Sequence, residues 1–231
     1  RDVGNARLDF EPQQGRTWTL VANAVDLRAD DPLGLNKAQF TSAPRSVDPS
    51  AIAFDTRKTV RQEQLGLVHD ATLDATDSLR AMVYAGERHT VQFQSIPVAA
   101  QASPLHPGGV IGLQREYAGT DLRWTHKRDA TFEWVAGVAL DSMREHRQGW
   151  QNFIGATLGV EGALRRDEAN RVTNVDPYLQ GVWKPAAAWT ITAGVRHSSV
   201  RFTSSDRYVV GTNGDDSGGV SYSATLPALA V

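Results

Sequence analysis

Hydrophobic and polar residues alternate with a period of two through most of the chain. In residues 132–140 every second side chain is apolar, and the residues between them include glutamate and glycine. Residues 79–85 show the same alternation, with arginine and tyrosine between the apolar positions. Because successive side chains of a strand point to opposite faces of its sheet, this period indicates β-strands with one apolar face. The other alternating segments are residues 5–10, 120–126, 178–183, 189–196 and 220–224.

The connections between these segments alternate between short and long. Short polar turns lie near residues 11–16, 69–78, 126–130 and 184–188. Long irregular segments lie near residues 29–56, 95–110, 147–173 and 203–219. We therefore predict an all-β fold, an antiparallel up-and-down meander of about eight or nine strands, formed by residues 1–231 as a single unit. Short turns would lie at one rim and long loops at the other, as in outer-membrane β-barrels.

Aromatic side chains flank three of the short turns. They are Phe10, Trp18, Trp124, Phe132, Trp134, Trp183 and Trp189. Aromatic rings collect where hydrocarbon meets water, because the ring is apolar while the polar edge of tryptophan needs a wet partner. We therefore predict that these residues form a membrane-interface girdle along one rim, and that the meander is a segment of a transmembrane β-barrel.

A soluble β-sandwich is the alternative fold, since it also has one buried face per sheet. It would be a ligand-binding module, for example for carbohydrate, with the aromatic residues in its core or in a sugar platform. It accounts less well for long loops on one side only, because loops of more than about 12–15 residues are uncommon in compact domains.

Composition narrows the classes of function. The chain is 41% hydrophobic, carries a formal charge of −2 and contains no cysteine. No run approaches the roughly 18 apolar residues that a membrane-spanning helix needs. The net charge provides no basic field, so we expect no nucleic-acid partner. Without cysteine there is neither a disulfide framework nor a thiolate metal site.

No group of residues predicts catalysis or a resident metal. Histidine neighbours charged residues at 87–89 and 144–147, where strands lead into long loops and solvated charges are expected. The sequence has neither the histidine spacing of zinc proteases nor a Gly-x-Ser-x-Gly turn, which leaves a lipase-type barrel without support. The acidic segment 211–219 lacks the ligand order of a calcium loop. We expect no enzyme activity, no catalytic residue and no metal site.

Several segments resemble the barrel portion of TonB-dependent ferric-siderophore receptors of the outer membrane. The segments that carry the similarity are residues 29–35, 44–49, 54–58, 91–97, 194–198 and 215–223. The resemblance extends over essentially the whole chain, and such receptors are plugged barrels of about 22 strands. No plug precedes Arg1 and no terminal aromatic strand follows, so the chain looks like the middle part of such a barrel, incomplete and without its plug.

The resemblance also implies a function for the intact receptor. It would capture an iron–siderophore complex outside the bacterial outer membrane and import it by energised movement of the plug. The implied partners are the ferric siderophore, TonB, the plug domain and outer-membrane lipid. Iron would enter only as part of the ligand, and no cofactor is expected.

Candidate ligand-binding residues follow from the alternation. Arg88, Gln92 and Gln94 are expected to point to the lumen as their strand rises towards a long loop, and Tyr117 lies in the strand opposite. Arg147 and Trp150 open the next long segment. The resemblance implies that such groups hold the siderophore, although a lumen residue can also simply contact plug or water. Within that long segment, residues 155–173 suggest a helical or hairpin excursion whose charges, at 165–168, are solvated.

Overall fold

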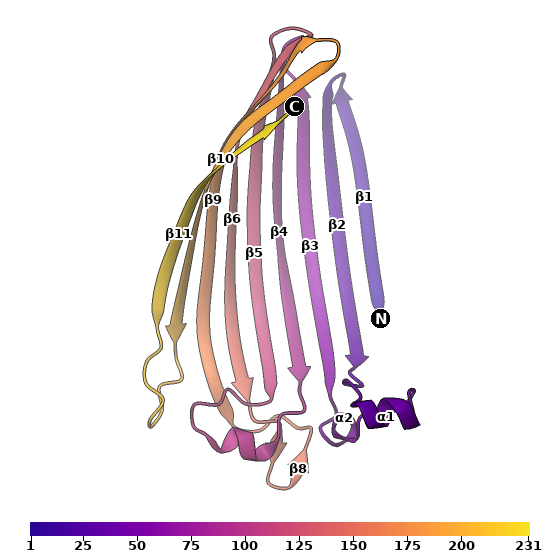
Figure 1. Cartoon of the computed structure of the whole chain (residues 1–231), viewed down its shortest axis with the longest axis vertical. Coiled ribbons are helices and arrows are strands. Elements are labelled where there is room, and N and C mark those ends of the chain that lie inside the picture. The colour runs from indigo at the N-terminus through magenta and orange to yellow at the C-terminus, as the bar shows by residue number, and fades with distance from the viewer.

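The computed structural model describes residues 1–231 and consists mainly of one nine-stranded antiparallel sheet (Figure 1). The order of the strands is β1-β2-β3-β4-β5-β6-β9-β10-β11, so each strand pairs with the next one of this sheet along the chain. The strands are β1 (Asp2–Gln13), β2 (Arg16–Asp30), β3 (Arg57–Thr72), β4 (Asp77–Phe93), β5 (Val110–Lys127), β6 (Phe132–Trp150), β9 (Leu164–Ala186), β10 (Trp189–Asp206) and β11 (Gly218–Ala230). The predicted antiparallel meander is confirmed.

The remaining elements lie in the long connections. A short hairpin, β7 (Phe153–Ile154) and β8 (Thr157–Leu158), joins β6 to β9. The helices are α1 (Lys37–Ser42), α2 (Pro49–Ala53) and the 3-10 helix η1 (Val98–Ala102). None of these helices has the length and apolar character required to cross a membrane. The short turns lie at one end of the sheet and the long loops at the other (Figure 1).

Local sequence explains how these elements start. Asn36 begins α1 with a capping box, in which its side chain and that of Gln39 each accept a backbone N–H of the other residue. Asp48 caps α2 in a similar way, accepting the Ser50 N–H at 2.8 Å. In the turn between β5 and β6, Asp129 accepts the backbone N–H groups of Thr131 and Phe132 at 2.7 and 3.0 Å. Asx turns of this kind reverse the chain within a few residues.

The sheet is a single layer, and its apolar residues do not form a core between two sheets. Only six hydrophobic residues are buried, and large apolar side chains on one face are exposed, including Leu8 (63%), Phe10 (59%) and Leu65 (59%). A soluble protein rarely leaves so many apolar side chains together in water. The β-sandwich alternative is therefore wrong, because no second sheet packs on this face.

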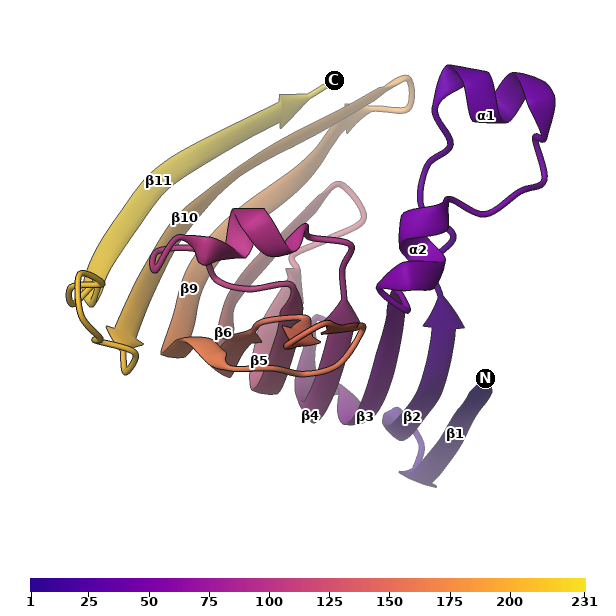
Figure 2. The ribbon, with the colours of Figure 1, turned by 90° about the horizontal axis from the view of Figure 1, so that it is seen from below.

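The sheet is curved (Figure 2). Its concave face lies opposite the exposed apolar side chains and carries polar residues such as Tyr84, Tyr117 and Asp141. Tyrosines reach across neighbouring strands on this face: Tyr117 lies over Gly86, and Tyr84 lies over Gly119. A Cβ atom at Gly86 would be 2.7 Å from the Tyr117 ring, so only glycine leaves room for it. Tyr84 then hydrogen-bonds to Asp141, two strands away. In Figure 2 the loops that carry η1 and the β7–β8 hairpin also lie on the concave side.

Two expectations about boundaries need correction. The segment 147–173 was expected to be irregular, but β6 continues to Trp150 and β9 begins at Leu164. The charges at 165–168 therefore belong to a strand rather than to a solvated loop, and Asp167 and Glu168 accept contacts from β6. The excursion between the two strands is a hairpin, one of the two forms expected.

Candidate ligand-facing wall and loop platform

The part of the concave wall near the long loops carries a row of charged and amide side chains. Arg88 of β4 is directly opposite Arg115 of β5, which is opposite Glu145 of β6, which is opposite Asn170 of β9. Arg115 forms an ion pair with Glu145, and Asn170 donates to the same carboxylate at 3.2 Å. The Nε atom of Arg88 is buried and has no hydrogen-bond partner. Because Glu145 is already paired with Arg115, the charge of Arg88 is left uncompensated in this row.

Hydrogen-bonded tyrosines form the next level of the wall, towards the short turns. The hydroxyl of Tyr117 donates to Gln64 Oε1 at 2.9 Å, and that of Tyr84 donates to Asp141. Each ring is fixed at both ends, by glycine beneath it and by its hydroxyl partner. Satisfied polar contacts of this kind hold both rings in one orientation.

On the same face, a buried carboxylate joins β9 to β10. The side chain of Asp176 is 2% exposed and accepts hydrogen bonds from Ser198 at 2.7 Å and from Asn174 at 3.1 Å. Arg196 completes the set as an ion-pair partner. A buried charge is tolerated when it is paired and hydrogen-bonded in this way, so β9 and β10 are joined by more than their backbone ladder.

Two of the long loops are locked together by buried amides. Gln101 of η1 and Asn152, just after β6, are both fully buried. Gln101 Nε2 donates to Asn152 Oδ1 at 2.6 Å, and Asn152 Nδ2 donates to the carbonyls of Gln94 and Ile96 at 2.6 and 3.1 Å. The loops 94–109 and 151–163 therefore form one unit, which we call the loop platform.

The first long loop is attached to the loop platform through Arg57. Its guanidinium lies over the Phe93 ring, 3.5 Å from the centroid, and donates to both the carbonyl and the carboxylate of Asp55. It also reaches the carbonyl of Gly159 at 3.4 Å. A stacked guanidinium with several acceptors fixes its neighbours more firmly than an ammonium could.

The structure places five of the six ligand candidates at the wall or the loop platform. By strand register Arg88, Gln92, Tyr117 and Arg147 face the concave side, and Arg147 approaches Glu168 at 4.0 Å. Gln94 follows β4 directly, and its carbonyl accepts from Asn152. Arg147 and Trp150 do not open a loop as expected, since both belong to β6.

Trp150 differs from the other five candidates. Its ring lies over Gly112, where a Cβ atom would be 2.8 Å away. Gly112 pairs with Gln148, two residues before Trp150, so this contact belongs to the convex side of the sheet. Sequence reasoning also missed Arg115, although it lies two residues before Tyr117 and shares its face.

The aromatic residues predicted at the membrane interface lie at the short-turn ends of the strands. Phe10 is opposite Trp18 across the first hairpin, and Phe132 is opposite Trp183 across β6 and β9. Trp124 and Trp134 meet edge to face, with centroids 4.6 Å apart. Trp189 begins β10.

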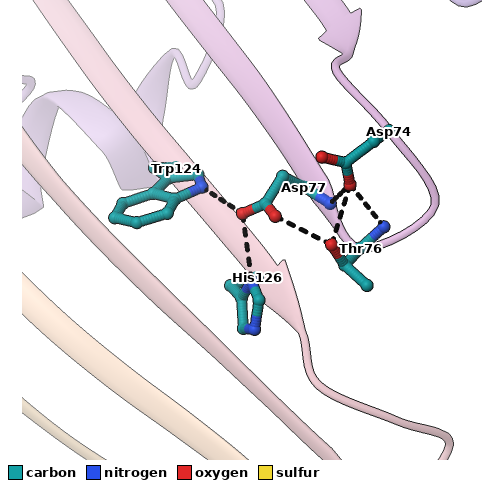
Figure 3. Close-up of polar contacts among 5 residues, drawn as sticks. All are labelled: Asp74, Thr76, Asp77, Trp124 and His126. Atoms are coloured by element: carbon teal, nitrogen blue, oxygen red, sulfur yellow. Dashed lines mark hydrogen bonds and ion pairs between the residues drawn. The ribbon is translucent and has the colours of Figure 1, made fainter.

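The polar edge of this rim is provided by Asp77 (Figure 3). Trp124 Nε1 donates to Asp77 Oδ1 at 2.7 Å, and His126 Nδ1 lies 3.0 Å from the same oxygen. Thr76 contacts the other Asp77 oxygen at 2.8 Å and donates to Asp74 at 2.7 Å. The indole ring can thus remain among apolar neighbours while its N–H is satisfied at the rim.

Carboxylates in the short turns are held in their charged form. The Thr76 hydroxyl and the backbone N–H groups of Thr76 and Asp77 lower the pKa of Asp74 below its ordinary value. The Thr131 side chain and backbone N–H, together with Arg128, lower the pKa of Asp129 in the same way. Hydrogen bonds to the anion favour it, so both turns depend on ionised aspartate. No group of three or more histidine, aspartate or glutamate side chains is arranged to hold a metal ion.

The family model of the TonB-dependent receptor-like β-barrel matches residues 5–231. The chain belongs to this family. The family comprises transporters and receptors of the outer membrane of Gram-negative bacteria, and not known enzymes. The resemblance on which the sequence analysis relied is thereby confirmed.

Solved barrels of this family share the fold at low sequence identity. The unliganded ferric citrate transporter FecA matches with 18% identity and a TM-score of 0.75, over 98% of this chain and 32% of its own length. The ferric yersiniabactin uptake receptor FyuA from Yersinia pestis matches with 16% identity and a TM-score of 0.76, over 98% and 34%. The copper transporter OprC matches with 15% identity and a TM-score of 0.63, over 98% and 32%. The chain thus spans about a third of the length of these structures.

Proposed function

We propose that the chain forms part of the wall of an outer-membrane receptor that imports an anionic ferric-siderophore complex by TonB-coupled transport. The concave face would line the lumen, next to a plug domain, and the loop platform would lie outside the cell. The convex apolar face would contact outer-membrane lipid. Iron would be carried as part of the cargo, and no cofactor would reside in the wall.

The observation that carries the proposal is the buried, unpartnered Arg88 Nε beside Arg115. Unsatisfied buried donors are rare in folded proteins, because each costs about 1–3 kcal/mol. A guanidinium that faces a lumen without an anionic partner is suited to the carboxylate, catecholate or hydroxamate oxygens of a metal chelate. Of the three structural neighbours described above, two are named for ferric complexes and one for copper. A cupric chelate therefore serves as the comparison ligand in the test.

A binding titration tests this assignment. The full receptor that contains this chain would be purified in detergent and titrated with ferric citrate, a ferric catecholate, a cupric chelate and the metal-free ligands. We expect an anionic ferric complex to bind best, and Arg88→Gln to weaken it at least about tenfold, or about 1.4 kcal/mol. Arg28→Gln is the matched control, since Arg28 is exposed at the same end of the sheet but on the convex face.

Uptake by cells tests the coupling to energy. Import of the radiolabelled ferric complex should stop when the proton gradient is dissipated, while surface binding continues. Uptake that persists without the gradient would contradict TonB coupling, and equal binding of metal-loaded and metal-free ligands would contradict the cargo.

Membrane placement is tested separately by tryptophan fluorescence. Lipids that carry a quencher in the interfacial region should quench the rim residues Trp18, Trp124 and Trp183, whereas Trp150 at the opposite end should respond to an aqueous quencher. Single-tryptophan variants assign each signal. Rim tryptophans that respond only to the aqueous quencher would contradict the proposed contact with lipid.

A further inference from the structure

Three exposed arginines that form no ion pair lie together on the convex face. Arg144 of β6 is directly opposite Arg171 of β9, and Arg201 of β10 is opposite Thr173, two residues further along β9. None of the three takes part in an ion pair. Like charges directly opposite each other on a sheet are destabilising, so the cluster is best explained by an anion that binds between them.

Two of these arginines form a small hollow with two hydroxyl groups. The hollow is lined by Arg171, Thr173, Arg201 and Thr203 alone. Across the β9–β10 pair, Arg171 is opposite Thr203 and Thr173 is opposite Arg201. The two arginines are therefore diagonal neighbours, and so are the two threonines. Two guanidinium groups and two hydroxyls around one hollow present donors from several directions, which suits the tetrahedral oxygens of a phosphate.

The arginines lie at a constant distance along their strands from the aromatic rim. Arg144, Arg171 and Arg201 are each twelve residues along their own strand from Phe132, Trp183 and Trp189, respectively. Twelve residues of strand extend about 40 Å, or about 30 Å across the membrane once the barrel tilt is included. That distance is close to the thickness of the hydrocarbon layer. If the aromatic rim lies at one membrane surface, the arginines lie at the level of the headgroups of the other leaflet.

The surface between the rim and the arginines is apolar. Leu140, Val175 and Leu179 lie there, and all three are exposed on the convex face. Acyl chains would therefore cover this surface between the arginines and the aromatic rim. A free anion would gain nothing from the apolar surface, whereas a lipid would use both parts of the site.

We propose that Arg171 and Arg201, with Thr173 and Thr203, bind the phosphate group of an outer-leaflet lipid headgroup. Arg144 flanks this site, and the facing Glu116 of β5 partly offsets its charge. The site rests on the proposed placement of the convex face in the outer membrane, but not on the identity of the cargo. Long arginine side chains can extend to the headgroup level while their stems cover apolar surface.

Native mass spectrometry of the detergent-purified receptor tests the site. The probes are phosphatidic acid and the neutral diacylglycerol with the same acyl chains. We expect retained phosphatidic acid adducts, little diacylglycerol, and at least a tenfold loss of phosphatidic acid affinity in the double variant R171Q/R201Q. The control R28Q removes an exposed convex-face arginine from β2 and should bind as the unmodified protein does.

Each outcome decides the proposal. Equal retention of the two lipids, or unchanged binding by R171Q/R201Q, overturns it. Displacement of the lipid by an equal concentration of inorganic phosphate would show an anion site without lipid preference and overturns the lipid assignment. If the double variant fails to fold, as judged by the gel mobility of unheated samples, R171Q and R201Q alone must each weaken binding. Failure of ferric-complex uptake with lipid binding intact would contradict the proposed transport function only.

Discussion

Trp124 donates its indole N–H to the carboxylate of Asp77 at 2.7 Å, across the β4–β5 pair at the short-turn rim. Asp77 also holds His126 and Thr76, so one carboxylate organises the end of this hairpin (Figure 3). The side chain of Asp77 is only 19% exposed. If this carboxylate were removed, water could not easily take its place as the hydrogen-bond partner of Trp124, His126 and Thr76.

We expect Asp77→Ala to lower the free energy of unfolding by about 1–2 kcal/mol, because the indole and imidazole lose a charged acceptor. The tryptophan emission should change at the same time. Urea titration of protein folded into lipid vesicles measures both effects. Asp77→Asn keeps an acceptor and should lose less; an alanine variant as stable as the asparagine variant would contradict the role given to this carboxylate.

Gly86→Ala should destabilise the sheet. The new Cβ would lie 2.7 Å from both the Tyr117 ring and the carbonyl of Glu63, and the carbonyl belongs to backbone that cannot move away cheaply. Overpacking of this kind costs about 1–3 kcal/mol. The control is Gly4→Ala, where nothing lies within 4 Å, and stability should be unchanged or rise by less than about 1 kcal/mol. Equal unfolding midpoints for the two variants would argue against a fixed Tyr117.

Asn152→Ala should loosen the loop platform without unfolding the barrel wall. The variant leaves the buried amide of Gln101 and the carbonyls of Gln94 and Ile96 without their partner, at a cost of about 1–3 kcal/mol. Hydrogen exchange should accelerate in residues 94–109 and 151–163 together. Leu105→Ala, in the same loop but 64% exposed, serves as control. Faster exchange in only one of the two loops would show that the amides do not couple them.

The β5–β6 turn should weaken in acid. Because hydrogen bonds lower the pKa of Asp129 in the folded state, its stabilising contribution is complete above the ordinary aspartate pKa and disappears as the pH falls through the lower, folded value. Hydrogen exchange of residues 128–132 should therefore rise at low pH. In Asp129→Asn, exchange should be faster at neutral pH and should lack this acid dependence. An unchanged acid profile in that variant would exclude Asp129 as its source.

Much of the fold was predictable because a sheet with one apolar face repeats a simple physical rule. Residues 132–140 must alternate if only one face is apolar, and the register of β6 confirms that alternation. Boundaries were less predictable. The sequence predicts a solvated run at residues 165–168, but Asp167 and Glu168 contact His146 and Arg147 of β6, each 21 residues earlier in the sequence.

The site was predictable only where the position of a residue follows from the alternation within its own strand. Arg88 and Tyr117 face the concave side because every second side chain of a strand does so, and this alternation is visible in the sequence. That Arg88 Nε has no partner follows from the ion pair between Glu145 and Arg115. This relation involves three strands and cannot be seen in the sequence of one. Gln101 and Asn152 carry no signal in the sequence, since they lie 51 residues apart in two different loops and are buried only once those loops meet.

The buried pair Gln101 and Asn152 determines which positions of the two loops are constrained by packing and which are not. Its contacts join Gln101 and Asn152 to each other and to the start of the first loop, so exposed residues such as Leu105 and Ile154, at 64% and 62% exposure, can be replaced without disturbing the anchor. Insertions at such tips cost little entropy once the ends are fixed. A wall with this construction can change its loop tips while the underlying sheet stays as it is.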